Sequence, residues 1–261
     1  MCGIAGIVSN NSSLVQQQKL QLMANALQHR GPDGEGFFIN EQQQVGFAHR
    51  RLSVIDLSNN AAQPMHYLGR YTITYNGEIY NYLELKLTLQ QKGYKFKSAS
   101  DTEVILAAYD CYQYQCLQYF DGMFAFAIWD NQTQQLFAAR DRFGEKPFYY
   151  FIDNEQFVFA SEMKALWANG IDKSINNKQL INYLSQGFVS NPTSGVTTFY
   201  NNISKLPAAS YLYYLPTTKQ LNGAMVAHAL PYASYLQEQE GVLLLVQQPP
   251  VGHGGGQPEY Q

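Results

Sequence analysis

Cys2 directly follows the initiator methionine in the sequence Met1-Cys2-Gly3-Ile4. If Met1 is removed, the Cys2 thiol and a free α-amino group belong to the same residue. A free thiol with a pKa near about 8.5 is mostly protonated at neutral pH, whereas an α-amino group with a pKa of about 7.7–8.0 is partly neutral and can accept the thiol proton. Cys2 is therefore a candidate nucleophile that carries its own base. The alternative is a small buried cysteine at the start of the first strand.

Five further segments carry polar residues in patterns suited to amide chemistry. They are residues 29–33, 49–56, 76–81, 100–104 and 140–147. Amide hydrolysis through a thioester requires a nucleophile, hydrogen-bond donors aimed at the developing oxyanion, and groups that hold the amino-acid end of the substrate. Each motif also has a simpler interpretation when it stands alone. Asn76-Gly77 is typical of a tight turn, Arg51 of a solvated strand end, and Asp101 of the first turn of a helix.

Helices and strands must position these segments. Apolar residues at helical spacing predict a helix over residues 15–28, and Ser100-Asp101-Thr102-Glu103 has the form of a capping box that starts a second helix. Residues 163–168 and 177–185 look like short helices, and residues 82–92 stay ambiguous between helix and strand because four leucines alternate among good helix formers. Strands are predicted over residues 4–8, 36–39, 45–49, 71–75, 123–129, 135–139, 147–152 and 156–161, with a last one near 212. This pattern is that of a layered α+β domain.

Read together and in this order, the Cys2-Gly3-Ile4 start and the five segments resemble the class II glutamine amidotransferase domain of glutamine-hydrolysing asparagine synthetases. That domain is an N-terminal-nucleophile hydrolase, and the resemblance implies a four-layer αββα sandwich. It runs from residue 2 to about residue 212. Residues 51–56, 63–65 and 161–166 look like the asparagine synthetase branch rather than the branches that pass ammonia to sugar phosphates or to phosphoribosyl pyrophosphate.

The resemblance implies which residues act at the reacting end of the substrate. Cys2 attacks the side-chain amide of L-glutamine and forms a thioester. The Asn76 side-chain amide and the Gly77 backbone N–H form the oxyanion hole. Removal of one such donor typically lowers turnover about 10²- to 10³-fold.

It also implies which residues hold the amino-acid end. The Arg51 guanidinium grips the α-carboxylate in a bidentate contact that lysine could not reproduce. Asp101 receives the α-ammonium group. Val54 and Glu78 line the same pocket, largely through backbone atoms.

Other polar residues of the motifs are interpreted as structural. Arg50 is expected at the surface. His29 and His49 suggest a cysteine–histidine pair, but the terminal amine makes a histidine base unnecessary. Charged pairs that hold loops under the site are expected from Arg30, Asp33, Asp141, Arg142 and Glu162.

Composition excludes several classes of partner. The 261 residues have a net charge of -3, with 14% charged and 46% hydrophobic residues and no basic block, so neither nucleic acid nor an anionic membrane is expected. The apolar stretches at 123–129 and 242–246 are far shorter than the ~18 residues of a membrane span. No signal-peptide pattern precedes Cys2, which favours a cytoplasmic protein. Cys111 and Cys116 fit neither a disulfide framework nor a zinc site and are interpreted as structural, with no metal site expected.

The chain departs from the family after the resemblance ends. Asparagine synthetases continue into an ATP-pyrophosphatase domain with a Ser-Gly-Gly-x-Asp-Ser loop, and no such string occurs here. No ATP site is therefore expected in this polypeptide. Residues 213–261 are predicted to form a divergent, disordered tail, because residues 247–256 are rich in proline and glycine. The glutaminase reaction needs no cofactor, and ATP and Mg belong only to the family's synthetase domain.

Three hypotheses for function follow. The first is a glutaminase that hydrolyses L-glutamine through Cys2, with aspartate as the ultimate ammonia acceptor and a separate synthetase domain or a homo-oligomer as partner. The second is a weak or inactive glutamine-binding or regulatory module. The third is another N-terminal-nucleophile amidase. Arg51 and Asp101 argue against the third, because together they demand a zwitterionic amino-acid end.

Overall fold

Two stacked β-sheets form the middle of the protein in the computed structural model, which describes residues 1–53, 61–189, 191, 195–225 and 243–244. The six-stranded sheet has the order β10-β8-β9-β1-β3-β2, and the seven-stranded sheet has the order β13-β12-β11-β7-β6-β5-β4. Neighbouring strands are antiparallel except β12 and β13. The strands are β1 (Gly3–Ser9), β2 (Gly34–Ile39), β3 (Val45–Arg51), β4 (Met65–Tyr67), β5 (Tyr71–Ile79), β6 (Gly122–Asp130), β7 (Gln135–Arg140), β8 (Tyr149–Ile152), β9 (Gln156–Ala160), β10 (Ser204–Lys205), β11 (Ser210–Leu215), β12 (Gln220–Met225) and β13 (Leu243–Leu244).

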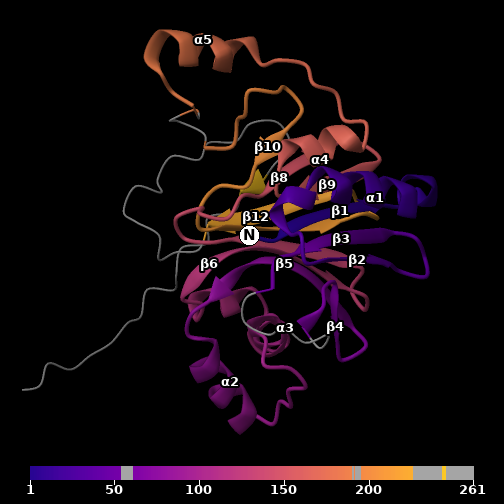
Figure 1. The fold of residues 1–261 in the computed structure, drawn as a ribbon, viewed down its shortest axis with the longest axis vertical. Helices are drawn as coiled ribbons and strands as arrows, with labels where there is room; N and C mark the ends of the chain where they lie inside the picture. The colour runs from indigo at the N-terminus through magenta and orange to yellow at the C-terminus, as the bar shows by residue number, and fades with distance from the viewer. Residues whose placement is uncertain (54–60, 190, 192–194, 226–242, 245–261) are drawn as a thin grey trace, which may run out of the picture.

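Helices cover the outer faces of both sheets. In Figure 1, α1 and α4 lie over the six-stranded sheet, whereas α2 and α3 lie under the seven-stranded sheet. The helices are α1 (Gln17–Ala26), α2 (Tyr82–Gln91), α3 (Asp101–Tyr112), α4 (Met163–Ala168) and α5 (Asn177–Gln186), with 3-10 turns η1 (Ser12–Leu14), η2 (Gln28–Arg30) and η4 (Gln113–Gln118). The predicted four-layer αββα sandwich is confirmed.

Three clusters of buried apolar residues fill the three spaces between the four layers. Along β1, Ile4 and Val8 point to the other sheet, whereas Ala5 and Ile7 point to α1 and α4. Because side chains alternate along a strand, a central strand of such a sandwich is buried on both faces and reads as a continuous apolar run. This explains why the predicted strands coincide with the observed ones within a few residues.

Residues 82–92 form a helix, α2, although their leucines alternate. Leu85 and Leu89 are buried at the i, i+4 spacing of one helix face, whereas Leu83 and Leu87 are 60% and 62% exposed. The strand-like alternation arises from exposed leucines.

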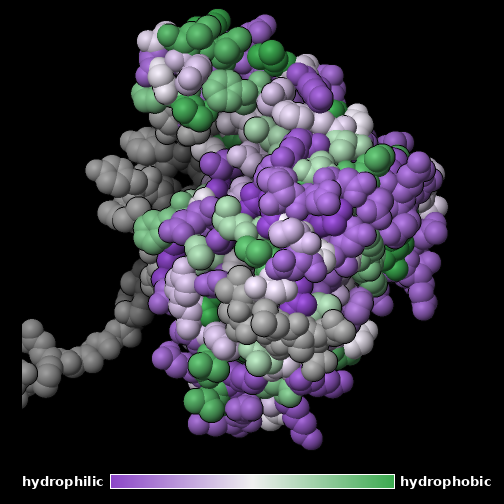
Figure 2. All heavy atoms as spheres, viewed as in Figure 1, coloured by the Kyte–Doolittle hydropathy of each residue, from purple (hydrophilic) through white to green (hydrophobic). Residues whose placement is uncertain are grey.

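The space-filling view also shows apolar side chains over α5, where Ile181 and Leu184 are exposed (Figure 2).

The domain boundary predicted at residue 212 falls inside β11, which continues to Leu215. β12 follows and pairs with β11 along six residue pairs, and Leu221 joins the core between the sheets. The ordered domain therefore extends past the predicted boundary, because the second strand of this hairpin completes the ladder. Most of the predicted tail, residues 226–242 and 245–261, lies outside the described residues.

Candidate functional site

The candidate site forms where strands of the two sheets end near each other. Cys2 immediately precedes β1, and β1 pairs with β3 so that Gly3 lies opposite Arg50. Two hydrogen bonds connect β3 to β5 of the other sheet. His49 Nε2 donates to the Tyr75 carbonyl at 3.1 Å, and the Thr74 hydroxyl contacts the Ala48 carbonyl at 3.5 Å. The segments around Cys2, Arg51 and Asn76 therefore meet at one rim of the sandwich.

The Cys2 thiol lies against the backbone of Leu52. Its Sγ contacts the Leu52 carbonyl at 3.5 Å and accepts a hydrogen bond from the Leu52 N–H at 3.4 Å. Burial raises the pKa of the Cys2 thiol, while the Leu52 N–H, the positive chain terminus and the charges of Arg51 and Arg30 oppose that rise. The thiol is thus protonated at neutral pH, and a nucleophilic role for it requires a nearby base.

Residues of the 29–33 loop hold the backbone around the thiol. Arg30 Nε donates to the Cys2 carbonyl at 2.9 Å, and Arg30 Nη1 pairs with Glu162 Oε1 at 2.8 Å. Burial works to raise the pKa of Glu162, but hydrogen bonds from Arg30, Lys164 and His29 lower it to about 2. Asp33 accepts a hydrogen bond from the Ser53 N–H at 2.8 Å. Arg30 and Glu162 therefore form the charged pair predicted for them, whereas the contact of Asp33 is with a backbone N–H.

Two expectations about charged residues are wrong. Arg50 is not a surface residue, since its side chain is 11% exposed, pairs with Glu35 and donates to the Ala24 carbonyl at 3.0 Å at the end of α1. Asp141 is held by backbone N–H groups, including those of Phe124, Glu145 and Lys146. Arg142 is exposed. The sequence shows that these residues are charged, but it does not show whether backbone groups or other side chains will be their hydrogen-bond partners.

Asn76 lies on β5 opposite Ala125 of β6 and is 1% exposed. Its Nδ2 has no hydrogen-bond partner among the described residues. A buried amide donor without a partner costs about 1–3 kcal/mol, so such a group is expected where a ligand can satisfy it. Next to it, a Cβ added at Gly77 would lie 2.3 Å from the Met123 carbonyl oxygen, so the close approach of β5 to β6 requires glycine.

Asp101 begins α3 and is 4% exposed. Its Oδ2 accepts hydrogen bonds from the Tyr75 hydroxyl at 2.7 Å and the Ile79 N–H at 3.0 Å. Burial raises the pKa of Asp101, and these two donors oppose the rise. Burial also raises the pKa of Tyr75 well above its ordinary value, and the negative charges of Asp101 and Glu78 raise it further.

The structure thus places six of the seven predicted site residues around the rim: Cys2, Arg51, Asn76, Gly77, Glu78 and Asp101. Arg51 is half-buried at the end of β3 and has an interaction partner. Val54 lies outside the described residues. Tyr75 and Gln63, whose Oε1 accepts from the Tyr75 N–H at 2.6 Å, were not predicted. The position of Tyr75 directly before Asn76 was the available signal, but a sequence does not show which strands will meet.

Comparison with known proteins decides the family. Residues 1–222 match the model of the glutamine amidotransferase domain. The chain belongs to this family. It is 43% identical over 198 residues to asparagine synthetase [glutamine-hydrolyzing] 1 of Bacillus subtilis, with 74% of this chain and 31% of that protein covered. It is 44% identical over 173 residues to asparagine synthetase [glutamine-hydrolyzing] 3 of the same organism, with 65% and 28% covered. The chain therefore spans about a third of the length of these relatives.

A solved structure supports the fold of this amidotransferase domain. Glutamine phosphoribosylpyrophosphate amidotransferase from B. subtilis superposes with a TM-score of 0.59 at 18% identity, covering 86% of this chain and 49% of the other. At this identity the likeness concerns the fold alone. The predicted family and enzyme class are confirmed by the match over residues 1–222 and by the relatives named above.

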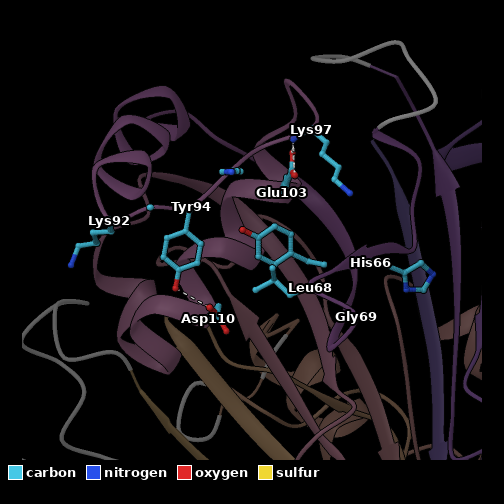
Figure 3. A pocket seen from close by; sticks show the side chains of 11 residues that line it. His66, Leu68, Gly69, Lys92, Tyr94, Lys97, Glu103 and Asp110 are labelled. Atoms are coloured by element: carbon cyan, nitrogen blue, oxygen red, sulfur yellow. Dashed lines mark hydrogen bonds between the residues drawn. The ribbon is translucent and has the colours of Figure 1, made fainter.

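A cavity of about 870 Å³ lies elsewhere in the domain, between the β4–β5 turn, the loop after α2, and α3 (Figure 3). None of the six described site residues lines it. At its wall, the Glu103 carboxylate accepts hydrogen bonds from the Lys97 and Ser98 N–H groups at 2.9 and 2.8 Å. The Ser100–Glu103 motif therefore has two uses: Asp101 faces Tyr75 at the rim, whereas Glu103 fixes the loop before α3.

The described part of the amidotransferase domain contains no group of three or more histidine, cysteine, aspartate or glutamate residues that could hold a metal ion. Within the same residues, every helix is too short or too polar to cross a membrane.

Proposed function

We propose that this domain hydrolyses L-glutamine to glutamate and ammonia through a γ-glutamyl thioester on Cys2. The observation that carries the proposal is the buried, unpartnered Asn76 Nδ2 on a strand tied by hydrogen bonds to the strand beside Cys2. A donor left unpaired at the same rim as a thiol fits an oxyanion hole, whose donors are satisfied only when the reacting carbonyl is bound.

The proposed reaction begins with removal of Met1, a residue that is 56% exposed. The freed α-amino group of Cys2 takes the thiol proton, and the sulfur forms a bond to the amide carbon of glutamine. Asn76 Nδ2 and the Gly77 N–H stabilise the oxyanion. The amide C–N bond then breaks, and the nitrogen leaves as ammonia with the proton from the amino group. Water attacks the thioester, which releases glutamate and restores the thiol.

The amino-acid end of glutamine would be held by two charges. Arg51 would bind the α-carboxylate, and Asp101 the α-ammonium group, with Glu78 and Val54 lining the pocket. Each charged hydrogen bond is worth about 1.5–3 kcal/mol. The burial of Asp101 supports this role, because a carboxylate in such a position gains most from a bound cation.

The test is intact mass before and after treatment with 6-diazo-5-oxo-L-norleucine, a glutamine analogue that alkylates this kind of cysteine, with glutamate release measured alongside. We expect loss of Met1, one adduct, and turnover that Cys2→Ala abolishes. Cys111→Ala is the matched control, since Cys111 is also half-buried and free, and it should keep both adduct and turnover. Full glutaminase activity in Cys2→Ala would end the proposal.

We further propose that the ammonia is used to make asparagine from aspartate by a synthetase partner. Two observations support this. The relatives are named asparagine synthetases and are about three times as long as the matched region. The α5 surface exposes Ile181 and Leu184, as an element covered by a partner would. The 261-residue chain alone should form no asparagine from aspartate, ATP and Mg²⁺, and a chelator should leave its glutamine hydrolysis unchanged, because no cofactor is proposed for that step.

A second candidate function is a glutamine-binding or regulatory module that turns over weakly. The raised pKa of the Cys2 thiol favours it, because a protonated thiol is a weak nucleophile. Glutamine binding by calorimetry without glutamate release would support this candidate over the first.

A further inference from the structure

Tyr75 occupies a position on β5 where the sheet no longer satisfies its backbone. The pairing of β4 with β5 runs from Tyr71 to Ile73 and then stops. Beyond that point, side chains take over the polar groups of Tyr75. Its N–H donates to Gln63 Oε1 at 2.6 Å, and its carbonyl accepts from His49 Nε2 at 3.1 Å. The backbone of Tyr75 is therefore fixed from two directions by groups outside the ladder.

The side chain of Tyr75 is fixed as well. It is 3% exposed, in the apolar core between the seven-stranded sheet and α3. Its hydroxyl donates to Asp101 Oδ2 at 2.7 Å, the same oxygen that accepts from the Ile79 N–H. Asp101 Oδ1 has a longer contact, 3.4 Å from the Ser100 hydroxyl. Two short bonds on one oxygen hold the carboxylate plane and leave the other oxygen more weakly bound.

A buried carboxylate in this setting needs its donors. Removing a charged acid from water is costly unless hydrogen bonds replace the lost hydration. The hydroxyl of Tyr75 stays protonated because burial raises the pKa of Tyr75 well above its ordinary value. It is thus a permanent donor to Asp101 across the pH range in which the protein is folded.

We propose that Tyr75 is a positioning residue for substrate recognition: its hydroxyl holds the Asp101 carboxylate in place for the α-ammonium group of glutamine. This inference rests on the proposed function, in which Asp101 binds that group. Tyr75 itself contacts no substrate atom in this scheme. Its removal should therefore weaken recognition of the ammonium group selectively, and not recognition of the carboxylates.

The test is calorimetric binding of two ligands, L-glutamate and glutarate, which differ only in the α-ammonium group. Tyr75→Phe removes the hydroxyl and keeps the ring. We expect the Kd for L-glutamate to rise about tenfold, which is about 1.4 kcal/mol, and the Kd for glutarate to stay within about twofold. In turnover, KM for L-glutamine should rise by a similar factor, with kcat changed much less.

Two controls accompany this variant. Tyr71→Phe removes a hydroxyl from the far end of the same strand. Tyr71 is 1% exposed and lies opposite Asp130 in the β5–β6 ladder. This variant should change neither Kd. Asp101→Asn should weaken L-glutamate binding at least as much as Tyr75→Phe.

The outcomes separate the two proposals. If Asp101→Asn weakens L-glutamate binding and Tyr75→Phe does not, the inference is wrong and the proposed substrate site stands. An equal loss for L-glutamate and glutarate in Tyr75→Phe would indicate a general disturbance of the site and would also overturn it. If the wild-type chain binds neither ligand, the proposed function fails, and the inference fails with it.

Discussion

Asn76→Ala offers the clearest separation of function from stability in this domain. The Asn76 Nδ2 is buried and has no partner among the described residues. In the substrate-free protein, removal of this buried amide should raise the free energy of unfolding by about 1–3 kcal/mol, because an unpaired polar group is no longer desolvated. The small cavity that alanine leaves should lower the free energy of unfolding by a similar amount. We therefore expect the free energy of unfolding to change by less than about 1 kcal/mol. If Asn76 donates to the oxyanion, kcat should fall about 10²- to 10³-fold, or about 2.7–4 kcal/mol in the activation free energy.

Asn40 provides the matched control. It is 6% exposed, and its Oδ1 accepts from the Gln44 and Val45 N–H groups at 2.7 and 3.0 Å while its Nδ2 donates to Gln42. Asn40→Ala leaves these backbone donors unsatisfied, so it should lower the free energy of unfolding by about 1–3 kcal/mol and leave kcat unchanged. The two asparagines thus predict opposite patterns.

The assays are urea unfolding followed by circular dichroism and the rate of glutamate release at saturating glutamine. The reasoning is refuted if Asn76→Ala behaves as Asn40→Ala should, with a loss of stability above about 2 kcal/mol and unchanged kcat. An unchanged kcat with unchanged stability would also remove Asn76 from the oxyanion hole.

Three other perturbations test the packing and charges of the structure. Gly36→Ala should destabilise the fold by about 1–3 kcal/mol in urea unfolding, because its Cβ would lie 2.0 Å from the Gln63 carbonyl oxygen, whereas Gly34→Ala, with its nearest atom at 3.9 Å, should cost much less. Burial, with the charge of Arg51, lowers the pKa of His49 to about 4. Between about pH 6.5 and pH 4 only the unfolded chain takes up a proton at this histidine, so the free energy of unfolding should fall as the pH drops through this range. His49→Gln should remove this pH dependence. The lowered pKa of Glu162, about 2, contributes stability that is present above about pH 4.3 and is lost as the pH falls from about 4.3 to 2. Glu162→Gln should reduce the pH dependence of the free energy of unfolding only between these two pH values.

The four layers were predictable because periodicity reports which faces are buried. β6 (Gly122–Asp130) is apolar along almost its whole length, since Phe124 and Phe126 face α3 while Ala125 and Ala127 face the other sheet. The start of α3 was also predictable, because Ser100 accepts from the Thr102 N–H at 3.1 Å as a helix cap does. The expected reciprocal bond from Glu103 does not occur, since its carboxylate binds the preceding loop instead.

What the sequence did not contain was the pairing of polar groups across layers. His49 carries the residue type of a catalytic base, yet in the fold it is a buried, neutral donor to a carbonyl on the other sheet. Arg50 and Arg51 are adjacent and chemically identical, but β3 turns Arg50 toward α1, where it pairs with Glu35. Such assignments depend on which face of a strand a residue occupies and on which layer lies there, and a one-residue change in register would exchange them.

The layer structure also fits the proposed role of Cys2 as the nucleophile. From Gly3 to Ser9 every residue of β1 is buried, because β1 is a central strand with a sheet on one face and helices on the other. A thiol or amine anywhere along that stretch would be inaccessible to substrate, and its backbone N–H would belong to the ladder. Cys2 is half-buried and lies one residue before the ladder begins. At residue 2, immediately before the ladder, an amino group lies outside the paired residues of the strand. The thiol of the same residue is still held by the Leu52 N–H at the end of the neighbouring strand.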